Sequence, residues 1–396
     1  MLNFYSGSSK AVNPKKAIKE SIDIAKSKTD EEFTLVILHS TSGHNLKQLL
    51  NTIRETLPNA SIIGCTGSGV VSNNYVSETL RTVALIFITG NEFVVSKVAG
   101  VTQNNCYDLS KLAAQQLKNN NTSINMVMAF APGLVVDGEA IIEGISDIFS
   151  HQVPILGGLA GFNGSEPNIF LFYNNEVLEQ AIVMVGFFDP SLIVAQASHH
   201  GYLAQENQKF IVTKVDNEFI CELDNKPAWP TLMASFELPA STLPTEVISL
   251  LALGTNLTES EKAAYDNKYK LRAPLMLSED GKAMAMQTRV SVGTKLTSCQ
   301  RDEEYLMNGV NGLIKRLTVQ FNKKKPVAVF QTDCMARGRM SNGVIEKEEI
   351  INNLQTGIIN DFPIAWLGVY AFGEFAQLDG KNHYHNYTSS ISVLLR

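Results

Sequence analysis

The sequence predicts an α/β fold of mixed α+β type, in which two mixed β-sheets are flanked by helices. Short apolar runs alternate with segments whose apolar residues recur every three to four positions, which is typical of strands alternating with amphipathic helices. Strand-like runs joined by short turns fill residues 169–223, and helical patterns return over 227–269. This change predicts two subdomains, 1–226 and 227–396, with the two sheets in a four-layer α/β/β/α arrangement.

The first half of the chain shows the alternation most clearly. Asn13-Pro14 predicts a helix start, because asparagine caps helices and proline favours the first helical position. The elements expected here, in order, are a helix after residue 14, a strand over 33–39, a helix over 46–57, a strand over 61–64, strands over 80–89 and 93–101 paired through a hairpin at 90–92, a helix over 107–117, a strand over 124–131 and a helix over 138–149.

The second half is predicted less regularly. Residues 227–269 have helical patterns, with 243–253 the most apolar stretch. No short-period repeat is present. The later elements expected are a strand over 284–292, a helix over 303–317, a helix within 341–359, and two apolar strands that lead to Cys334 and to Gly373.

Composition excludes several classes of protein. The chain has 396 residues, 44% of them hydrophobic, and a net charge of -6, so a nucleic-acid-binding surface is not expected. Its apolar runs are too short or too interrupted for a transmembrane helix, and its start does not resemble a signal peptide. The five cysteines never occur in Cys-x-x-Cys spacing, which argues against a disulfide scaffold or a zinc knuckle. We therefore expect a cytoplasmic protein without a metal or cofactor.

The segment 327–339 is the first candidate for a site. A short apolar run is followed by a glycine-containing turn with Cys334, Arg337 and Arg339, and Glu374 follows a second apolar run. Arginines in such a turn suit a carboxylate, and Glu374 suits an ammonium group, so a zwitterion such as an amino acid would fit. The alternative is that Arg337 and Glu374 pair with each other or cap backbone carbonyls.

Cys334 has a second interpretation. Nearby arginines would favour a thiolate, and His383 or His385 could act as a base, which would make a hydrolase or acyl transferase. Against this, cysteine is among the residues most often buried as a small apolar side chain. Binding is the preferred interpretation.

Two glycine-rich turns complete the candidate site. Residues 64–69 and 157–161 both follow short apolar strands, where glycine permits positive φ and close approach to the backbone. Neither turn has a phosphate-loop pattern, so contact with a small ligand and a purely structural turn remain alternatives.

Two further polar groups are given structural interpretations. His199 and His200 are adjacent on an expected strand and point to opposite faces, so they do not indicate a metal site. Asp137 and Glu139 are explained as the N-cap and a first-turn acid of the helix that follows.

At these motifs the chain resembles the FIST family, which occurs in bacterial sensory proteins and in some eukaryotic F-box proteins. The similar segments of the N-terminal half are Gly64-Cys65-Thr66-Gly67-Ser68-Gly69, Gly157-Gly158-Leu159-Ala160-Gly161, Gly201, Val212-Thr213 and Leu223-Asp224-Asn225-Lys226-Pro227. Those of the C-terminal half are Cys334-x-x-Arg337-Gly338, Gly368-x-Tyr370-x-x-Gly373-Glu374 and His385-Asn386-x-Thr388. Phe162 stands where the family commonly has an aspartate.

The resemblance implies a FIST N-terminal domain over 1–226, a FIST C-terminal domain over 227–396, and a sensory module for a small ligand, with amino acids proposed. Signalling would then need a separate partner protein. The alternatives are an enzyme that uses Cys334 and a protein-interaction scaffold. The ligand-binding residues expected are Gly64, Cys65, Thr66, Gly157, Gly158, Gly161, Cys334, Arg337, Arg339, Gly373, Glu374, His385 and Asn386.

Overall fold

The computed structural model describes residues 1–134, 136–164, 166–265, 267–338, 344–359 and 364–396. Within these residues the fold is mixed α+β, with nine helices and four β-sheets. The expectation of two sheets is therefore wrong, and the four-layer arrangement is not confirmed. Local patterns show which segments form strands, whereas strand pairing depends on residues far apart in the chain.

Three of the sheets contain the same four-stranded unit. In each unit the first strand pairs antiparallel with the fourth, the fourth pairs antiparallel with the second, and the second pairs parallel with the third. The first unit comprises β1 (Asn3–Ser9), α1 (Pro14–Lys26), β2 (Leu35–Ser40), α2 (Leu46–Thr56), β3 (Ser61–Thr66) and β6 (Val83–Thr89). The second comprises β7 (Phe93–Ala99), α3 (Cys106–Asn120), β8 (Met126–Pro132), α4 (Gly138–Phe149), β9 (Ile155–Ala160) and β12 (Ala181–Phe187). The third comprises β13 (Ile193–His199), α8 (Glu303–Gln320), β22 (Pro326–Cys334), α9 (Val344–Ile359), β23 (Ala365–Ala371) and β26 (Ser389–Leu395).

The units exchange hairpins in a cycle. After its third strand, each unit sends a hairpin to the sheet of another unit: β4–β5 joins β23, β10–β11 joins β3, and β24–β25 joins β9. The bounds of these strands are Gly69–Ser72 and Tyr75–Ser77, Leu171–Tyr173 and Glu176–Leu178, and Gly373–Leu378 and Lys381–His385. The exchange ties the three units into one body.

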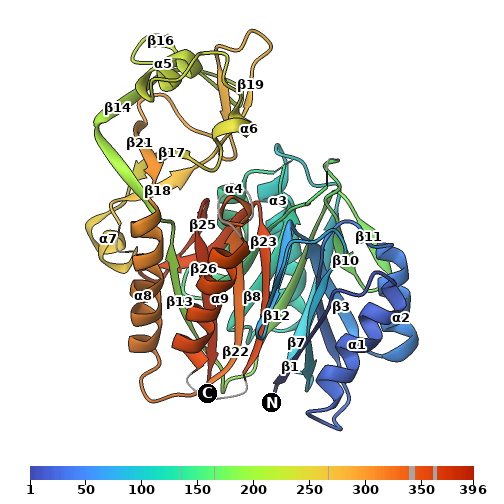
Figure 1. Ribbon diagram of the computed structural model, residues 1–396. Helices are drawn as coiled ribbons and strands as arrows, with labels where there is room; N and C mark the ends of the chain where they lie inside the picture. The colour runs from blue at the N-terminus through green and yellow to red at the C-terminus, as the bar shows by residue number, and fades with distance from the viewer. Residues whose placement is uncertain (135, 165, 266, 339–343, 360–363) are drawn as a thin grey trace.

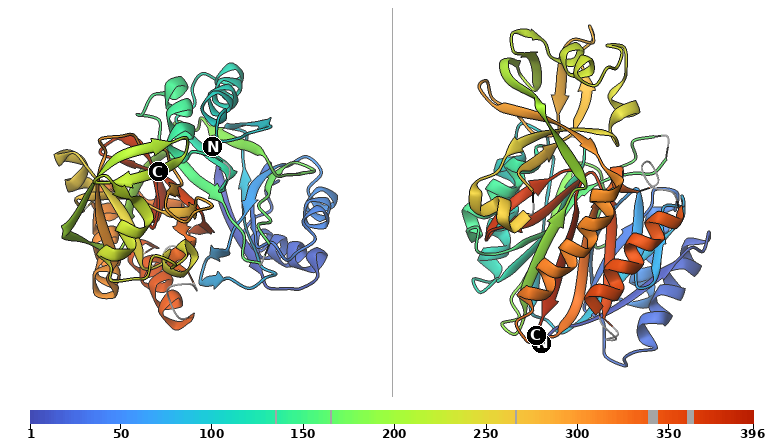
Figure 2. Two further views of the ribbon diagram at one scale, coloured as in Figure 1. Left: turned by 90° about the horizontal axis from the view of Figure 1, so that it is seen from above. Right: turned by 60° about the vertical axis from the view of Figure 1, so that its left-hand side comes forward.

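The three sheets face a common core, and a pair of helices covers the outside of each sheet. Viewed from above, the helix pairs lie on three sides of the body (Figure 2). The central core takes side chains from all three units, for example Ile37, Met128 and Phe330. Within the described residues, no helix is both long and apolar enough to span a membrane.

The fourth sheet belongs to a lobe inserted into the third unit. Residues 200–302 leave the body after β13 and return at α8, and most of this lobe stands above the ends of the body strands (Figure 1). Its elements are β14 (Tyr202–Asp216), β15 (Phe219–Leu223), β16 (Lys226–Pro227), α5 (Ala228–Ser235), α6 (Pro244–Val247), β17 (Leu251–Asn256), α7 (Glu259–Tyr265), β18 (Tyr269–Arg272), β19 (Pro274–Leu277), β20 (Met284–Met286) and β21 (Lys295–Arg301). The division of the chain at residue 226 stays a prediction, and this residue lies in β16.

The predicted helix starts are confirmed in detail, but one predicted hairpin is wrong. The side chain of Asn13 accepts a hydrogen bond from the Lys16 amide at 3.0 Å and caps α1, and Asp137 caps α4 in the same way. Strands β6 and β7 do not pair. β6 lies between β1 and β2, whereas β7 pairs with β12, so residues 90–92 connect two units. Turn residues between two apolar runs predict that the chain changes direction, but they do not determine which strand each run pairs with.

Candidate ligand site beneath the inserted lobe

The end of β22 lies directly beneath the inserted lobe. Cys334 ends this strand, and its amide donates to the Thr388 carbonyl at 2.8 Å. Residues Met335–Arg337 then form a single turn of 3₁₀ helix. The apolar run that the sequence shows thus carries Cys334 and the next residues to the seam between body and lobe.

A cavity of about 220 Å³ lies at this seam. Most of its wall is apolar. The body contributes Leu134, Phe162, Cys334, Met335, Ala336, Phe372, Asn386 and Tyr387. The lobe contributes Thr245, Ile248, Ala273, Leu275 and Gln287. A ligand in this cavity would therefore touch both parts of the molecule.

Two side-chain amides, those of Asn386 and Gln287, contribute polar groups to the cavity wall. Asn386 Nδ2 donates to Gln287 Oε1 at 2.9 Å and to the Tyr384 hydroxyl at 2.8 Å, while Gln287 Nε2 donates to the Gly133 carbonyl at 2.8 Å. Asn386 is 1% exposed, and no group within the described residues donates to its Oδ1. A buried amide oxygen without a donor is costly, so this atom is suited to a ligand that carries a hydrogen-bond donor.

The environment of Cys334 opposes a role as nucleophile. Burial raises the pKa of the Cys334 thiol well above its usual value, and the neighbouring Glu374 adds to the shift. The thiolate is the reactive form of cysteine, so a thiol held in its protonated form is a poor nucleophile at neutral pH. Cys334 contributes to the wall of the cavity as a small, largely apolar group.

Arg337 and Glu374 lie behind the wall rather than in it. Arg337 follows the wall residue Ala336, is 5% exposed, and donates Nη1 to the His200 carbonyl at 3.0 Å. Glu374 is fully buried in β24 and accepts hydrogen bonds from the amide and the hydroxyl of Thr388 at 3.1 and 2.7 Å. Arg339 lies outside the described residues.

Burial also changes the charge expected for Glu374. It raises the pKa of this carboxyl well above its usual range, and the hydrogen bonds from Thr388 only partly oppose the shift. The pKa of the nearby Asp333 is raised for the same reason. An ammonium group needs an ionised carboxylate, so the role expected for Glu374 requires a change in its environment.

The three strand ends of the repeated units meet beside the cavity. The amide of Gly161 donates to the Thr66 carbonyl at 3.0 Å, that of Ser68 to Tyr370 at 2.9 Å, and that of Phe372 to Leu159 at 2.9 Å. Each bond joins two different units, and together they close a cycle. The glycine-rich motifs therefore lie where the three units contact one another.

The glycines are required by close packing of the backbone. A Cβ on Gly64 would overlap the Leu38 carbonyl, one on Gly157 the Ala129 carbonyl, and one on Gly158 the Gly373 carbonyl. Gly64 and Gly157 also have φ of +147° and +99°. Gly161 packs against Phe372, a wall residue, and so approaches the cavity.

The remaining predicted residues are buried near the three-unit contact or beneath the lobe. Cys65 Sγ lies 3.5 Å from His39 Nδ1, and burial raises the pKa of the Cys65 thiol. The Thr66 hydroxyl donates to the Gly161 carbonyl at 2.9 Å. His385 is fully buried with its ring centroid 5.5 Å from that of Tyr265, and burial lowers its pKa well below the usual value.

The structure thus places two of the predicted residues, Cys334 and Asn386, in the cavity wall. Sequence reasoning missed the lobe residues Ile248, Leu275 and Gln287, for which no motif gives a signal. Phe372 could have been found, because it lies inside the motif that ends in Glu374.

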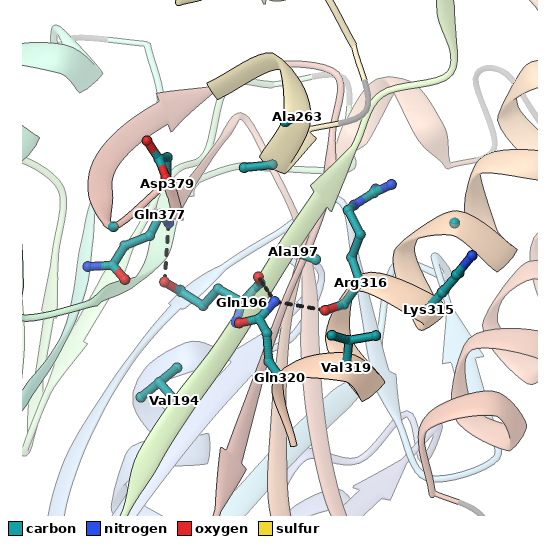
Figure 3. Close-up of a pocket in the computed structure, with 13 residues that line it drawn as sticks. Val194, Gln196, Ala197, Ala263, Lys315, Arg316, Val319, Gln320, Gln377 and Asp379 are labelled. Carbon is teal, nitrogen blue, oxygen red and sulfur yellow. Dashed lines mark hydrogen bonds between the residues drawn. The ribbon is translucent and has the colours of Figure 1, made fainter. Parts of the chain in front are cut away.

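A second, larger hollow of about 560 Å³ lies on the side of the molecule, between β13, α7, α8 and the turn that joins β24 to β25 (Figure 3). It contains none of the predicted residues. Within the described residues, no group of three or more histidine, cysteine, aspartate or glutamate side chains is placed to hold a metal ion.

The chain is similar in sequence to a known protein, and the match covers only part of each chain. It is 25% identical over 228 residues to the uncharacterized protein MJ1623 of Methanocaldococcus jannaschii, a match that spans 54% of this chain and 43% of that protein. The chain thus matches less than half the length of this relative.

Two solved structures align with the whole chain and with 99% of their own chains. They are the cyanuric acid hydrolase from A. caulinodans, at 7% identity and a TM-score of 0.38, and a chorismatase, at 9% and 0.35. The FIST N domain matches residues 34–226 and the FIST C domain matches residues 234–377, which together are most of the chain. The predicted resemblance is therefore confirmed, and the chain belongs to the FIST family.

Proposed function

We propose that this chain is a sensory module that binds a small ligand in the cavity beneath the inserted lobe and signals through a separate partner protein. FIST domains are associated with sensory roles in signal transduction. The observation that carries the proposal is the composition of the cavity wall, which takes residues from both the body and the lobe. A ligand that contacts both parts stabilises the arrangement in which they are together, and a partner can read that change.

The cavity favours a small ligand that is mainly apolar. Its volume of about 220 Å³ is below the range of roughly 300–1,000 Å³ that is usual for drug-sized ligands. Phe372, Ile248 and Leu275 would contact the apolar part, and Asn386 would accept a hydrogen bond from the polar end. An amino acid with an apolar side chain has this chemistry.

Arg337 and Glu374 support the wall in this proposal. Arg337 holds the turn that carries Ala336, and Glu374 holds Thr388, which follows the wall residue Tyr387. Direct contact of their charges with a zwitterion would need these side chains to turn toward the cavity on binding. Substituting a wall residue is therefore a sharper test than substituting either charge.

Calorimetric titration with the standard amino acids tests the proposal. We compare the wild type with Ala273→Leu, which fills the cavity from the lobe side, and with Ala263→Leu, a matched control on the exposed side of α7. The expected result is saturable heat with at least one apolar amino acid for the wild type and the control, and its loss in Ala273→Leu. No saturable heat with any of them, together with a native mass spectrum that shows no co-purified molecule, would contradict the proposal. If Ala273→Leu bound the amino acid as tightly as the wild type, the binding site would lie outside this cavity.

A further inference from the structure

The hollow on the side of the molecule follows an unpaired sheet edge. β13 is the end strand of its sheet, because it pairs with β26 on one side and with no other strand within the described residues. The hollow runs past this edge and is lined there by Val194, Gln196 and Ala197 (Figure 3). An unpaired strand edge offers backbone donors and acceptors to another extended chain.

A side chain takes the place of a neighbouring strand at the centre of this edge. Gln320 of α8 accepts from the Gln196 amide at 3.2 Å and donates to the Gln196 carbonyl at 2.9 Å. A carboxamide that bonds to both backbone groups of one residue reproduces the pairing that a strand would make. Figure 3 shows Gln320 lying against this part of β13.

Alternation along the strand identifies the other groups that face outward. Because the backbone of Gln196 points to the edge, those of Val194 and Ser198 do so as well. The Ser198 carbonyl accepts from Arg316 Nη2 at 3.1 Å, which agrees with this direction. Val194 receives no such partner from the described residues, so its amide and carbonyl remain available.

The walls of the hollow fit an extended peptide. Its volume is about 560 Å³, its far side is formed by Asp379 and Gly380 of the β24–β25 turn, and the exposed Lys315 of α8 places a positive charge on the opposite side. A segment with an acidic side chain facing α8 matches this distribution.

We propose that this hollow docks an extended, acidic segment of a partner protein, which adds to β13 as a further strand after displacing Gln320. Backbone pairing supplies affinity in such additions, and side-chain contacts with the walls supply selectivity. The partner protein of the proposed function would then be one that carries an extended, acidic segment. Only the link between ligand binding and docking rests on the proposed function. Ala263 and Ala264 of α7 form one wall of the hollow and belong to the inserted lobe, so the hollow changes shape if the lobe moves.

A proline substitution tests the docking edge directly. Val194→Pro removes an amide that points away from β26, so the existing sheet keeps its bonds, and Val194→Ala is the matched control that retains the amide. A phage library of random decapeptides is selected on the ligand-free full chain with counter-selection on Val194→Pro. The most enriched peptide, labelled with fluorescein, is then titrated by anisotropy.

We expect the selected peptide to be acidic. Val194→Ala should bind it like the wild type, whereas Val194→Pro should bind it at least about tenfold more weakly. Gln320→Ala should bind it several-fold more tightly, because no side-chain amide must be displaced from the edge. Hydrogen exchange at the Val194 and Ser198 amides should slow in the complex. This readout and Gln320→Ala decide the matter if Val194→Pro fails to fold.

The inference would be overturned if no peptide were enriched on the wild type, or if Val194→Pro bound the peptide as tightly as the wild type. A third contrary outcome is a wild-type dimer in sedimentation that Val194→Pro abolishes, because the occupant of the edge would then be a second copy of the chain. The assay contains no cavity ligand and Ala273→Leu leaves the edge intact. Failure of docking and failure of ligand sensing are therefore separate results.

Discussion

Arg272 of the inserted lobe forms an ion pair with Glu139, the first-turn acid of helix α4 in the body. Lys270 of the lobe also contacts Glu139, at 2.7 Å, and lies 3.3 Å from His383 Nδ1. His383 Nε2 in turn lies 3.1 Å from Glu261 of α7. This network joins the lobe to the body at several points.

Arg272→Met should loosen the lobe. Arg272 is 5% exposed and its removal leaves the partly buried Glu139 paired with Lys270, so we expect a loss of about 2 kcal/mol in the free energy of unfolding. Amide exchange should accelerate in β18 and at the start of α4. Lys16→Met, which removes an exposed pair with Glu20, is the control and should cost less than about 0.5 kcal/mol. Equal costs for the two variants would show that the network does not hold the lobe.

Acid should destabilise the whole protein from about pH 6.5 downward. Burial lowers the pKa of six of the seven histidines, to about 3 for His39 and His200 and to about 4 for His44 and His383. Between these values and the ordinary pKa near 6.5, the unfolded chain binds protons that the native state does not bind. The contribution of these histidines to stability is therefore complete above pH 6.5 and falls as the pH is lowered, by roughly 1.4 kcal/mol per pH unit for each such histidine.

His44→Gln provides the measurement for one histidine. Neither ring nitrogen of His44 has a hydrogen-bond partner within the described residues, so glutamine removes the titrating group at small structural cost. Urea unfolding at several values between pH 4.5 and 6 should give a slope that is lower by roughly 1.4 kcal/mol per pH unit than in the wild type. An unchanged slope would mean that His44 titrates normally in the native state.

Gly157→Ala should be far more damaging than Gly100→Ala. Both glycines have positive φ, +99° and +82°, so both substitutions carry backbone strain of about 1 kcal/mol. Only the Cβ at position 157 overlaps a neighbouring strand, at the Ala129 carbonyl, whereas position 100 has nothing within 4 Å. We expect a loss of roughly 3 kcal/mol or more for Gly157→Ala in chemical unfolding. Similar losses for both would assign the role of Gly157 to its φ alone.

Limiting iodoacetamide should modify Cys221 before the other cysteines. Cys221 is half-buried, whereas Cys65, Cys106, Cys299 and Cys334 are buried, and burial raises the pKa of each of these four thiols. Peptide mass spectrometry near neutral pH gives the order of labelling. Labelling of Cys334 faster than a model thiol such as glutathione would revive the enzyme interpretation.

The sequence predicted best where the signal is local. The helix α2 is recognisable from the spacing of Leu46, Leu49, Leu50 and Ile53, all of which are buried, and the caps at Asn13 and Asp137 form as expected. Residues 243–253, predicted helical, instead contain the short helix α6 and the start of β17. A short apolar run fits either a strand or a helix, and packing within the lobe decides between them.

The interpretation of Glu139 shows the same limit. A first-turn acid beside an N-cap has a sufficient local explanation, and Asp137 indeed caps α4. The ion pairs to Arg272 and Lys270 join residues more than 130 positions apart, and no local pattern contains them.

The sequence by itself determined the family, most of the helices and the strands that lead to Cys334 and Gly373, because periodicity, caps and motifs are properties of neighbouring residues. Tertiary structure decided the four sheets, the cyclic exchange of hairpins and the cavity under the lobe. It also decided the chemistry of the site: burial keeps Cys334 protonated and raises the pKa of Glu374, while Gln287, unmarked in the sequence, meets Asn386 across the seam. Charge and reactivity depend on solvent exposure, which only the packed chain defines.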